Sequence, residues 1–168
     1  MIANYYNNFP KLNGNDIIGE IDESKFGKRK YNRGKHIEGV WILGMIERSN
    51  TKRVKLIAVE NRSKDILKEH IQQTIKKDSI IFTDGWKGYI GLSEYFKCHK
   101  TVNHFLEFVC SDDPNVHTNT IEETWAAVKR QIKPRHRTKK DIPLYLIRYM
   151  ILKNEEEHPV LAAIKYLF

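Results

Sequence analysis

Residues 79–85 read Ser-Ile-Ile-Phe-Thr-Asp-Gly, a continuous apolar run that ends in an acid and a glycine. Such a run is typical of a strand buried on both faces, which in α/β proteins lies parallel to a neighbour after a helical crossover. The preceding residues agree, because Ser63 is a helix-capping type and apolar residues then recur every three or four positions up to Ile75. The sequence therefore predicts a helix over 63–75 that leads into a strand over 79–84.

Three further strands are predicted upstream, over 17–24, 40–47 and 54–60, because apolar and β-branched residues dominate these runs. Turn-forming residues at 48–51 join the last two strands, which indicates an antiparallel meander. Residues 1–15 carry Asn and Gly with little periodicity, so we expect a flexible N-terminal arm.

The second half of the chain is predicted to be rich in helix. A helix is expected over 89–96 and a strand over 101–109. Apolar residues on one stripe predict a helix over 120–132 that a proline ends, an Asp-Ile-Pro start predicts another over 141–152, and a last one is expected over 160–168. The element order indicates an α/β protein.

Composition points to one folded basic domain, which we place at residues 16–168 of the 168. Lys and Arg number 29 against 21 for Asp and Glu, so the net charge of +8 favours a polyanionic partner, above all nucleic acid. Cys98 and Cys110 are too few for a disulfide framework, and their spacing does not suggest zinc. The sequence shows no signal peptide and no apolar run of about 18 residues, so we expect a protein that is not secreted and has no membrane partner.

Three acids are candidates for a catalytic site. Asp22 lies in the first strand and Asp84 ends the buried one, where an ionised carboxylate is costly unless a metal or an open site compensates it. For Asp84, ordinary turn chemistry remains an alternative. At about 100° per residue, Glu122 borders the apolar stripe of its helix, while Glu123 points to solvent and Lys129 lies two turns beyond Glu122 on the same rim.

Acids that converged in this way would offer the oxygen ligands that Mg²⁺ or Mn²⁺ prefers. Two such ions would suit phosphodiester cleavage, and Lys129 would hold a DNA phosphate. Two basic clusters flank the proposed site and are expected to bind the DNA backbone, although a solvated loop is the alternative for either. The expected DNA-binding residues are Lys28, Arg29, Lys30, Arg33, Lys35, Lys129, Arg130, Lys133, Arg135 and Arg137.

Aromatic and histidine side chains near these acids have two interpretations each. Trp86, Tyr89 and Trp125 could stack on splayed bases or pack in the core; packing is favoured for Trp125, and the two readings are balanced for Trp86. His104 is a candidate for the metal site, and His117 for a supporting or phosphate contact at a helix N-terminus.

Several motifs, in order between about residues 19 and 152, resemble the catalytic domain of ISXO-like DDE transposases, which bacterial insertion sequences share with Merlin-type eukaryotic transposons. They are Glu20-Ile-Asp-Glu-Ser with Phe26-Gly-Lys-Arg-Lys, Val40-Trp-Ile-Leu-Gly, Thr83-Asp-Gly-Trp-Lys-Gly-Tyr, Val102-Asn-His, and His117-Thr-Asn-Thr-Ile-Glu followed by Trp125 and Lys129. Each is short, and the resemblance rests on their joint order and on the seven-residue step from Glu122 to Lys129.

The resemblance implies an RNase H-like fold, with a mixed five-stranded sheet flanked by helices, and metal-dependent cleavage and strand transfer at transposon ends. Asp22, Asp84 and Glu122 match the acidic triad of the family, and Lys129 matches its basic residue. Because some relatives use Asn as the third ligand, Asn119 stays an alternative. The resemblance also implies a homodimer that pairs two DNA ends, in the cytoplasm of a bacterium or the nucleus of a eukaryote.

Family members usually carry a zinc-ribbon or other DNA-recognition module before the catalytic domain. About 18 residues precede the first motif here, so we expect that module to be absent from this chain. A catalytically inactive or domesticated transposon-derived DNA-binding protein, and a general RNase H-like nuclease, therefore remain as alternative functions. The presence of all three acids favours retained chemistry.

Overall fold

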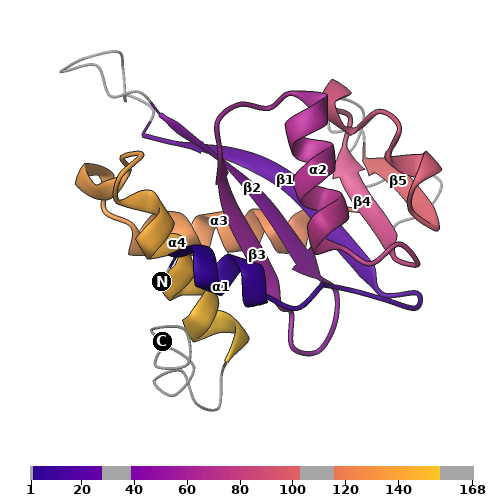
Figure 1. Ribbon diagram of the computed structural model, residues 1–168, viewed down its shortest axis with the longest axis horizontal. Helices are drawn as coiled ribbons and strands as arrows, with labels where there is room; N and C mark the ends of the chain where they lie inside the picture. Colours follow the sequence, from indigo (N-terminus) through magenta and orange to yellow (C-terminus); the bar gives the residue numbers. More distant parts are fainter. Residues whose placement is uncertain (1, 28–38, 103–115, 156–168) are drawn as a thin grey trace.

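A computed structural model describes residues 2–27, 39–102 and 116–155 of the chain, and its central element is a mixed five-stranded sheet (Figure 1). The helices and strands are α1 (Ile2–Asn8), β1 (Ile18–Phe26), β2 (Val40–Glu47), β3 (Val54–Val59), α2 (Lys64–Thr74), β4 (Ile80–Asp84), β5 (Cys98–Val102), α3 (Asn119–Gln131) and α4 (Ile142–Asn154). Short 3-10 helices are η2 (Lys87–Tyr89), η3 (Leu92–Glu94) and η4 (Pro134–His136).

The strand order across the sheet is β3-β2-β1-β4-β5. Strands β1, β2 and β3 form an antiparallel meander, β4 pairs in parallel with β1, and β5 pairs in parallel with β4. The predicted meander and the predicted parallel strand after a helical crossover are both confirmed. The crossover through α2 returns the chain beside β1, which places the carboxyl end of β4 next to the middle of β1.

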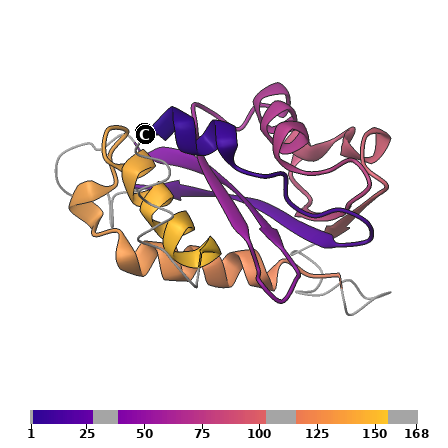
Figure 2. The same ribbon diagram turned by 60° about the horizontal axis from the view of Figure 1, so that its bottom comes forward.

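The sheet separates two apolar layers. Figure 2 shows α3 and α4 on one side of the sheet and α2 on the other. On the α3 side, the core includes Ile42, Ile121 and Trp125. On the α2 side, it includes Ile21 and Leu67. Alternation along β1 therefore points residues 20, 22 and 24 toward α3 and residues 21 and 23 toward α2.

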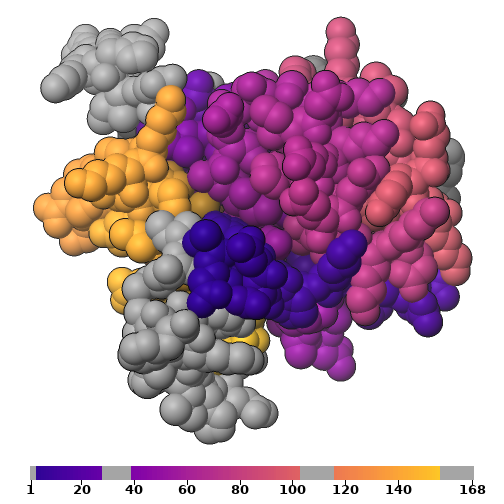
Figure 3. All heavy atoms as spheres, viewed as in Figure 1, coloured from indigo at the N-terminus to yellow at the C-terminus, as the bar shows by residue number. Residues whose placement is uncertain are grey.

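The expectation of a flexible arm over residues 1–15 is wrong for its described part. Helix α1 packs beside α4 and edge strand β3, where Tyr5 is only 2% exposed and the Tyr6 hydroxyl donates a hydrogen bond to the Leu56 carbonyl (2.8 Å). Leu12 is fully buried and forms a β-bridge with Ile75. Burial of these aromatic and aliphatic groups outweighs the weak local propensity of the Asn-rich sequence. In Figure 3, α1 and α2 together cover much of one face of the molecule.

Two other expectations differ from the structure. The helix expected over 89–96 is a pair of short 3-10 helices, because Gly91 adopts a left-handed conformation (φ +90°) that interrupts any longer helix. The fifth strand begins at Cys98, earlier than expected, and residues 103–109 lie outside the described ranges. The helix expected over 160–168 also lies outside them.

The remaining helices lie close to their predicted positions. Ser63 precedes α2 as predicted, and α4 begins after Asp141 with a proline in its first turn. None of the helices in the described ranges combines the length and apolar character that crossing a lipid bilayer requires.

Candidate active site

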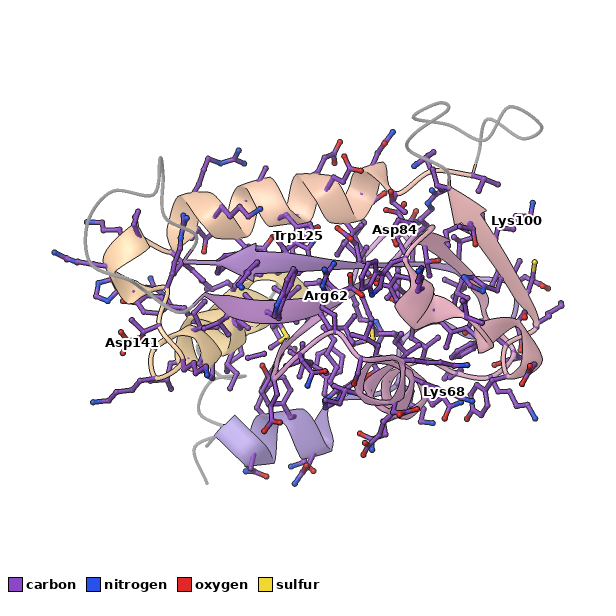
Figure 4. All side chains as sticks on the ribbon, turned by 90° about the horizontal axis from the view of Figure 1, so that it is seen from above. Arg62, Lys68, Asp84, Lys100, Trp125 and Asp141 are labelled. Carbon is purple, nitrogen blue, oxygen red and sulfur yellow. The ribbon has the colours of Figure 1, made fainter. Side chains whose placement is uncertain are left out.

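Strands β1 and β4 bring two of the predicted acids side by side. The parallel ladder pairs Ile21 with Thr83, so Asp22 and Asp84 are the next residues along the two strands. Strand β4 ends at Asp84, whereas β1 continues to Phe26, and the sheet is therefore open beside the second half of β1. Figure 4 shows Asp84 near the start of α3 and Trp125 farther along the same helix.

Trp125 anchors α3 on Asp22. The indole Nε1–H donates a hydrogen bond to Asp22 Oδ2 (2.9 Å), and the ring is 5% exposed. This contact depends on Gly44, which faces Asp22 across the β1–β2 ladder. A β-carbon at Gly44 would lie 2.6 Å from Trp125 Cζ2 and 3.0 Å from Ile121 Cδ1, so only glycine lets the helix approach this closely.

Asp22 is electrostatically coupled to the other two acids. Its pKa is raised to about 6, chiefly by burial and in addition by repulsion from the carboxylates of Asp84 and Glu122. The hydrogen bond from Trp125 opposes this rise. The three predicted acids therefore lie near the carboxyl end of β4, close enough for the charges of Asp84 and Glu122 to act on Asp22.

The outer rim of the site comes from α3. Glu122, in its first turn, is exposed and accepts a long hydrogen bond from the Thr118 hydroxyl (3.4 Å). Asn119, the first residue of α3, is exposed as well. Lys129 is also exposed. Partial desolvation of its ammonium group and the charge of Arg137 lower the pKa of Lys129, while the charge of Asp22 raises it.

A buried ion pair fixes the N-terminus of α3 to the sheet. Glu20 on β1 is 0% exposed and accepts hydrogen bonds from Arg48 Nε (2.5 Å) and from the backbone N–H of Ile121 (2.9 Å). Arg48 also donates to the backbone carbonyl of His117 and lies 2.8 Å from His117 Nδ1. Glu20 thus satisfies a backbone donor of the first helical turn, as a capping side chain would. His117 is part of this contact, because its Nδ1 also lies 3.8 Å from Glu20 Oε1.

A fourth acid lies on the other face of the sheet. The pKa of Glu23 is raised to about 7, mainly by burial and further by Asp22 and Asp84. Nearby Arg62 and the hydroxyl of Tyr89 lower it. Glu23 Oε1 and the Tyr89 hydroxyl are nevertheless buried without a hydrogen-bond partner of normal geometry among the described residues.

The basic residues predicted to bind DNA are only partly described. Residues 28–38, which hold the first basic cluster, lie outside the described ranges, as do His104 and Cys110. Lys129, Arg130, Lys133 and Arg135 are exposed along the end of α3 and the following loop. Arg137 instead donates to the carbonyls of Ile132 (3.0 Å) and Lys129 (2.6 Å), so its guanidinium caps the C-terminus of α3.

The acids fit a divalent cation in donor type. Their carboxylate oxygens are the hard donors that Mg²⁺ and Mn²⁺ prefer. A bound cation would also relieve the repulsion that Asp84 and Glu122 exert on Asp22. In their present positions, no three His, Cys, Asp or Glu side chains of the described ranges surround a common point at ligand distances. Asp22 accepts a hydrogen bond from the indole N–H of Trp125, and Asp84 accepts one from the backbone N–H of Trp86. Glu122 is the exposed member of the three acids.

The strand order β3-β2-β1-β4-β5, with acids on β1, β4 and a following helix, defines the RNase H-like class of polynucleotide-processing domains. Within that class, the model of the ISXO2-like transposase domain family matches residues 12–151, and the chain belongs to this family. Membership implies a role in DNA transposition, DNA as partner and a nucleotidyl-transferase type of activity, and DDE transposases generally use divalent metal ions. No curated protein sequence matches the chain.

Sequence reasoning missed the residues that hold α3 in place. Glu20 precedes Asp22 by two positions on β1, and this spacing alone puts both acids on one face of the sheet. Gly44 inside an apolar strand was a second signal, because an interior glycine marks close approach of another element. Arg48 had no comparable signal, since its partners are distant in sequence.

Proposed function

We propose that this chain is a DDE-type transposase domain that cleaves DNA at a transposon end and joins that end to target DNA in a metal-dependent reaction. In this proposal Asp22, Asp84 and Glu122 hold one or two Mg²⁺ or Mn²⁺ ions, with Asn119 as the alternative third ligand. Lys129 holds a DNA phosphate beside them.

Two successive displacements at phosphorus make up the reaction. Water attacks the scissile phosphodiester, and the bond to the 3′ oxygen breaks to leave a 3′ hydroxyl on the transposon end. That hydroxyl then attacks a target phosphodiester, which forms one bond and releases one target 3′ hydroxyl. When bound, the metal ions activate the attacking oxygen and stabilise the leaving oxygen.

The chain's own residues position these groups. Asp22 and Asp84 sit on adjacent strands of one rigid sheet, which suits ligands that must keep a fixed separation. Trp125 orients the Asp22 carboxylate through its indole N–H. Glu122 and Lys129 lie two helical turns apart on α3, so an acid and a cation line the same opening.

The observation that carries this proposal is the electrostatic coupling of Asp22 with Asp84 and Glu122 at the open end of the β1–β4 ladder. Two carboxylates that repel Asp22 at an opening of the β1–β4 ladder favour a bound cation over a purely structural role.

The direct test replaces one proposed metal ligand with an uncharged side chain of the same shape. Asp22→Asn should abolish Mg²⁺-dependent cleavage of a DNA substrate, because one anionic oxygen donor is lost, while salt-sensitive DNA binding stays within about twofold. Glu123→Gln, on the exposed face of the same helix, serves as the matched control. Cleavage that survives Asp22→Asn would refute the triad.

A second experiment separates the proposed reaction from the alternatives. A pre-cleaved duplex end is supplied with Mn²⁺ and a target plasmid, and the products are resolved on a gel. Joined product is the expected result. Hydrolysis alone would indicate a general nuclease, and binding without either product would indicate a catalytically inactive DNA-binding domain.

A further inference from the structure

An alternating ladder of cations and tryptophans lies on the α2 side of the sheet, next to the proposed active site. The Arg62 guanidinium carbon lies 4.0 Å from the Trp41 ring centroid and 4.1 Å from that of Trp86. Lys25 Nζ lies 5.3 Å from the Trp41 ring. The four residues come from β1, β2, the β3–α2 loop and the turn after β4, so tertiary structure alone assembles the ladder. Figure 4 shows Arg62 on the opposite side of the sheet from Trp125.

Trp86 is the last residue of this ladder and contacts Asp84, one of the candidate catalytic acids. Its backbone N–H donates to Asp84 Oδ1 (2.9 Å). Its indole lies against Gly88, where a β-carbon would come within 2.8 Å of Nε1. Arg62 lies over the ring, yet Trp86 remains 36% exposed. The indole is thus fixed in place with part of its surface open.

The other two aromatic candidates are closed to a ligand. Tyr89 is 2% and Trp125 is 5% exposed, and each packs in an apolar cluster. Ile90 is more exposed than Trp86, at 64%, but it has no aromatic ring and no fixed support of this kind among the described residues. Trp86 therefore combines exposure, rigidity and closeness to Asp84.

We propose that Trp86, supported by Arg62 and Trp41, is a stacking site for an unpaired nucleobase of the DNA substrate. A preorganised indole loses little conformational entropy on binding, and stacking of a base on an aromatic side chain contributes about 1–3 kcal/mol. Only Gly85 separates Trp86 from Asp84, which places this site beside the phosphodiester that the acids would process. Arg62 adds a permanent positive charge under the ring, which favours a polyanionic ligand.

The inference rests on the proposed function for its ligand, DNA, but its test does not require turnover. The probe is a 30-base-pair duplex with one unpaired 2-aminopurine, compared with the same duplex fully paired, both in Ca²⁺. Wild-type protein should bind the unpaired probe more tightly and quench its fluorescence. Trp86→Leu should weaken binding of the unpaired probe about 5- to 20-fold and abolish the quench, while binding of the paired duplex changes less than about twofold.

Two further variants make the result decisive. Trp86→Phe keeps an aromatic face and should restore most of the affinity, which a purely structural role would not require. Ile90→Ala, an exposed apolar change in the same region, should leave both affinities unchanged. Thermal melting of each variant checks that it folds. Equal loss of affinity for both probes, or no loss for either, would overturn the stacking site.

Failure of the two proposals can be told apart. If Asp22→Asn still cleaves DNA while Trp86→Leu loses the unpaired-base preference, the catalytic triad fails and the stacking site stands. If Trp86→Leu retains that preference while Asp22→Asn stops cleavage, the reverse holds.

Discussion

At the scale of single residues, Gly44 has no room for a side chain. A methyl group there would press on Trp125, so Gly44→Ala should displace the indole, destabilise the domain by about 1–3 kcal/mol and sharply reduce cleavage. Urea unfolding and a cleavage assay measure the two effects. Gly85→Ala is the matched control for stability, because its β-carbon would meet only Thr101 Cγ2 at 4.0 Å. Equal stability of the two variants would contradict the close contact.

The indole N–H of Trp125 also sets the protonation of Asp22. Its hydrogen bond lowers the pKa of that carboxyl, so Trp125→Phe should raise the pKa further. If Asp22 binds metal as its carboxylate, as proposed, the acidic limb of the pH profile for Mg²⁺-dependent cleavage should move to higher pH. An unchanged limb, in a variant that melts like wild type, would mean that Asp22 does not control it.

At the scale of the element, α3 depends on the buried Glu20 for its first turn. Glu20→Ala should leave Arg48 without its buried counter-charge and the Ile121 N–H without its acceptor, at a cost of about 3–5 kcal/mol. Glu20→Gln keeps an acceptor and should cost less. Hydrogen exchange should speed up at the first turn of α3 before other helices, and Glu123→Gln should show no such change. Uniform acceleration across the molecule would refute local anchoring.

At the scale of the whole molecule, the clustered acids make stability depend on pH. Burial raises the pKa values of Asp22 and Glu23 to about 6 and 7, above the usual 3.8 and 4.5, so the folded state binds protons more tightly. Their stabilising contribution is complete below about pH 4 and is lost as the pH rises through 6 and 7. Between pH 5 and 8, these two acids should lower the unfolding free energy of metal-free protein, and the lowered pKa values of half-buried His70 and His99 offset part of that loss because they stabilise the folded state as the pH rises.

Metal should reverse that loss. Mg²⁺ or Mn²⁺ should raise the melting temperature more at pH 8, where the acids are ionised, than at pH 5, and chelation should remove the gain. Asp22→Asn should flatten both the pH dependence and the metal effect. The pH window avoids Glu47, whose pKa is lowered and whose contribution disappears only at more acidic pH. A metal effect that is the same at both values would argue against binding at these acids.

Much of the fold could be predicted because its signals are local. The buried strand at β4, the meander of β1 to β3 and the amphipathic α3 each show a periodicity that one segment carries by itself. The acids of the site were predicted from position along those elements and from the resemblance to transposases. The segment before β1 was misjudged because the burial of Tyr5 and Leu12 comes from α4, β3 and α2, which are distant in sequence.

Local order along the chain was therefore enough to predict most of the elements, their class and three candidate acids. Folding in three dimensions decided what surrounds those acids: an indole on Asp22 that Gly44 admits, an ion pair under α3, and a tryptophan ladder assembled from four segments. The physical reason is that hydrogen bonding, close packing and charge repulsion act over a few ångströms in space. Residues such as Glu20 and Ile121, or Arg62 and Trp86, meet only after the sheet has formed.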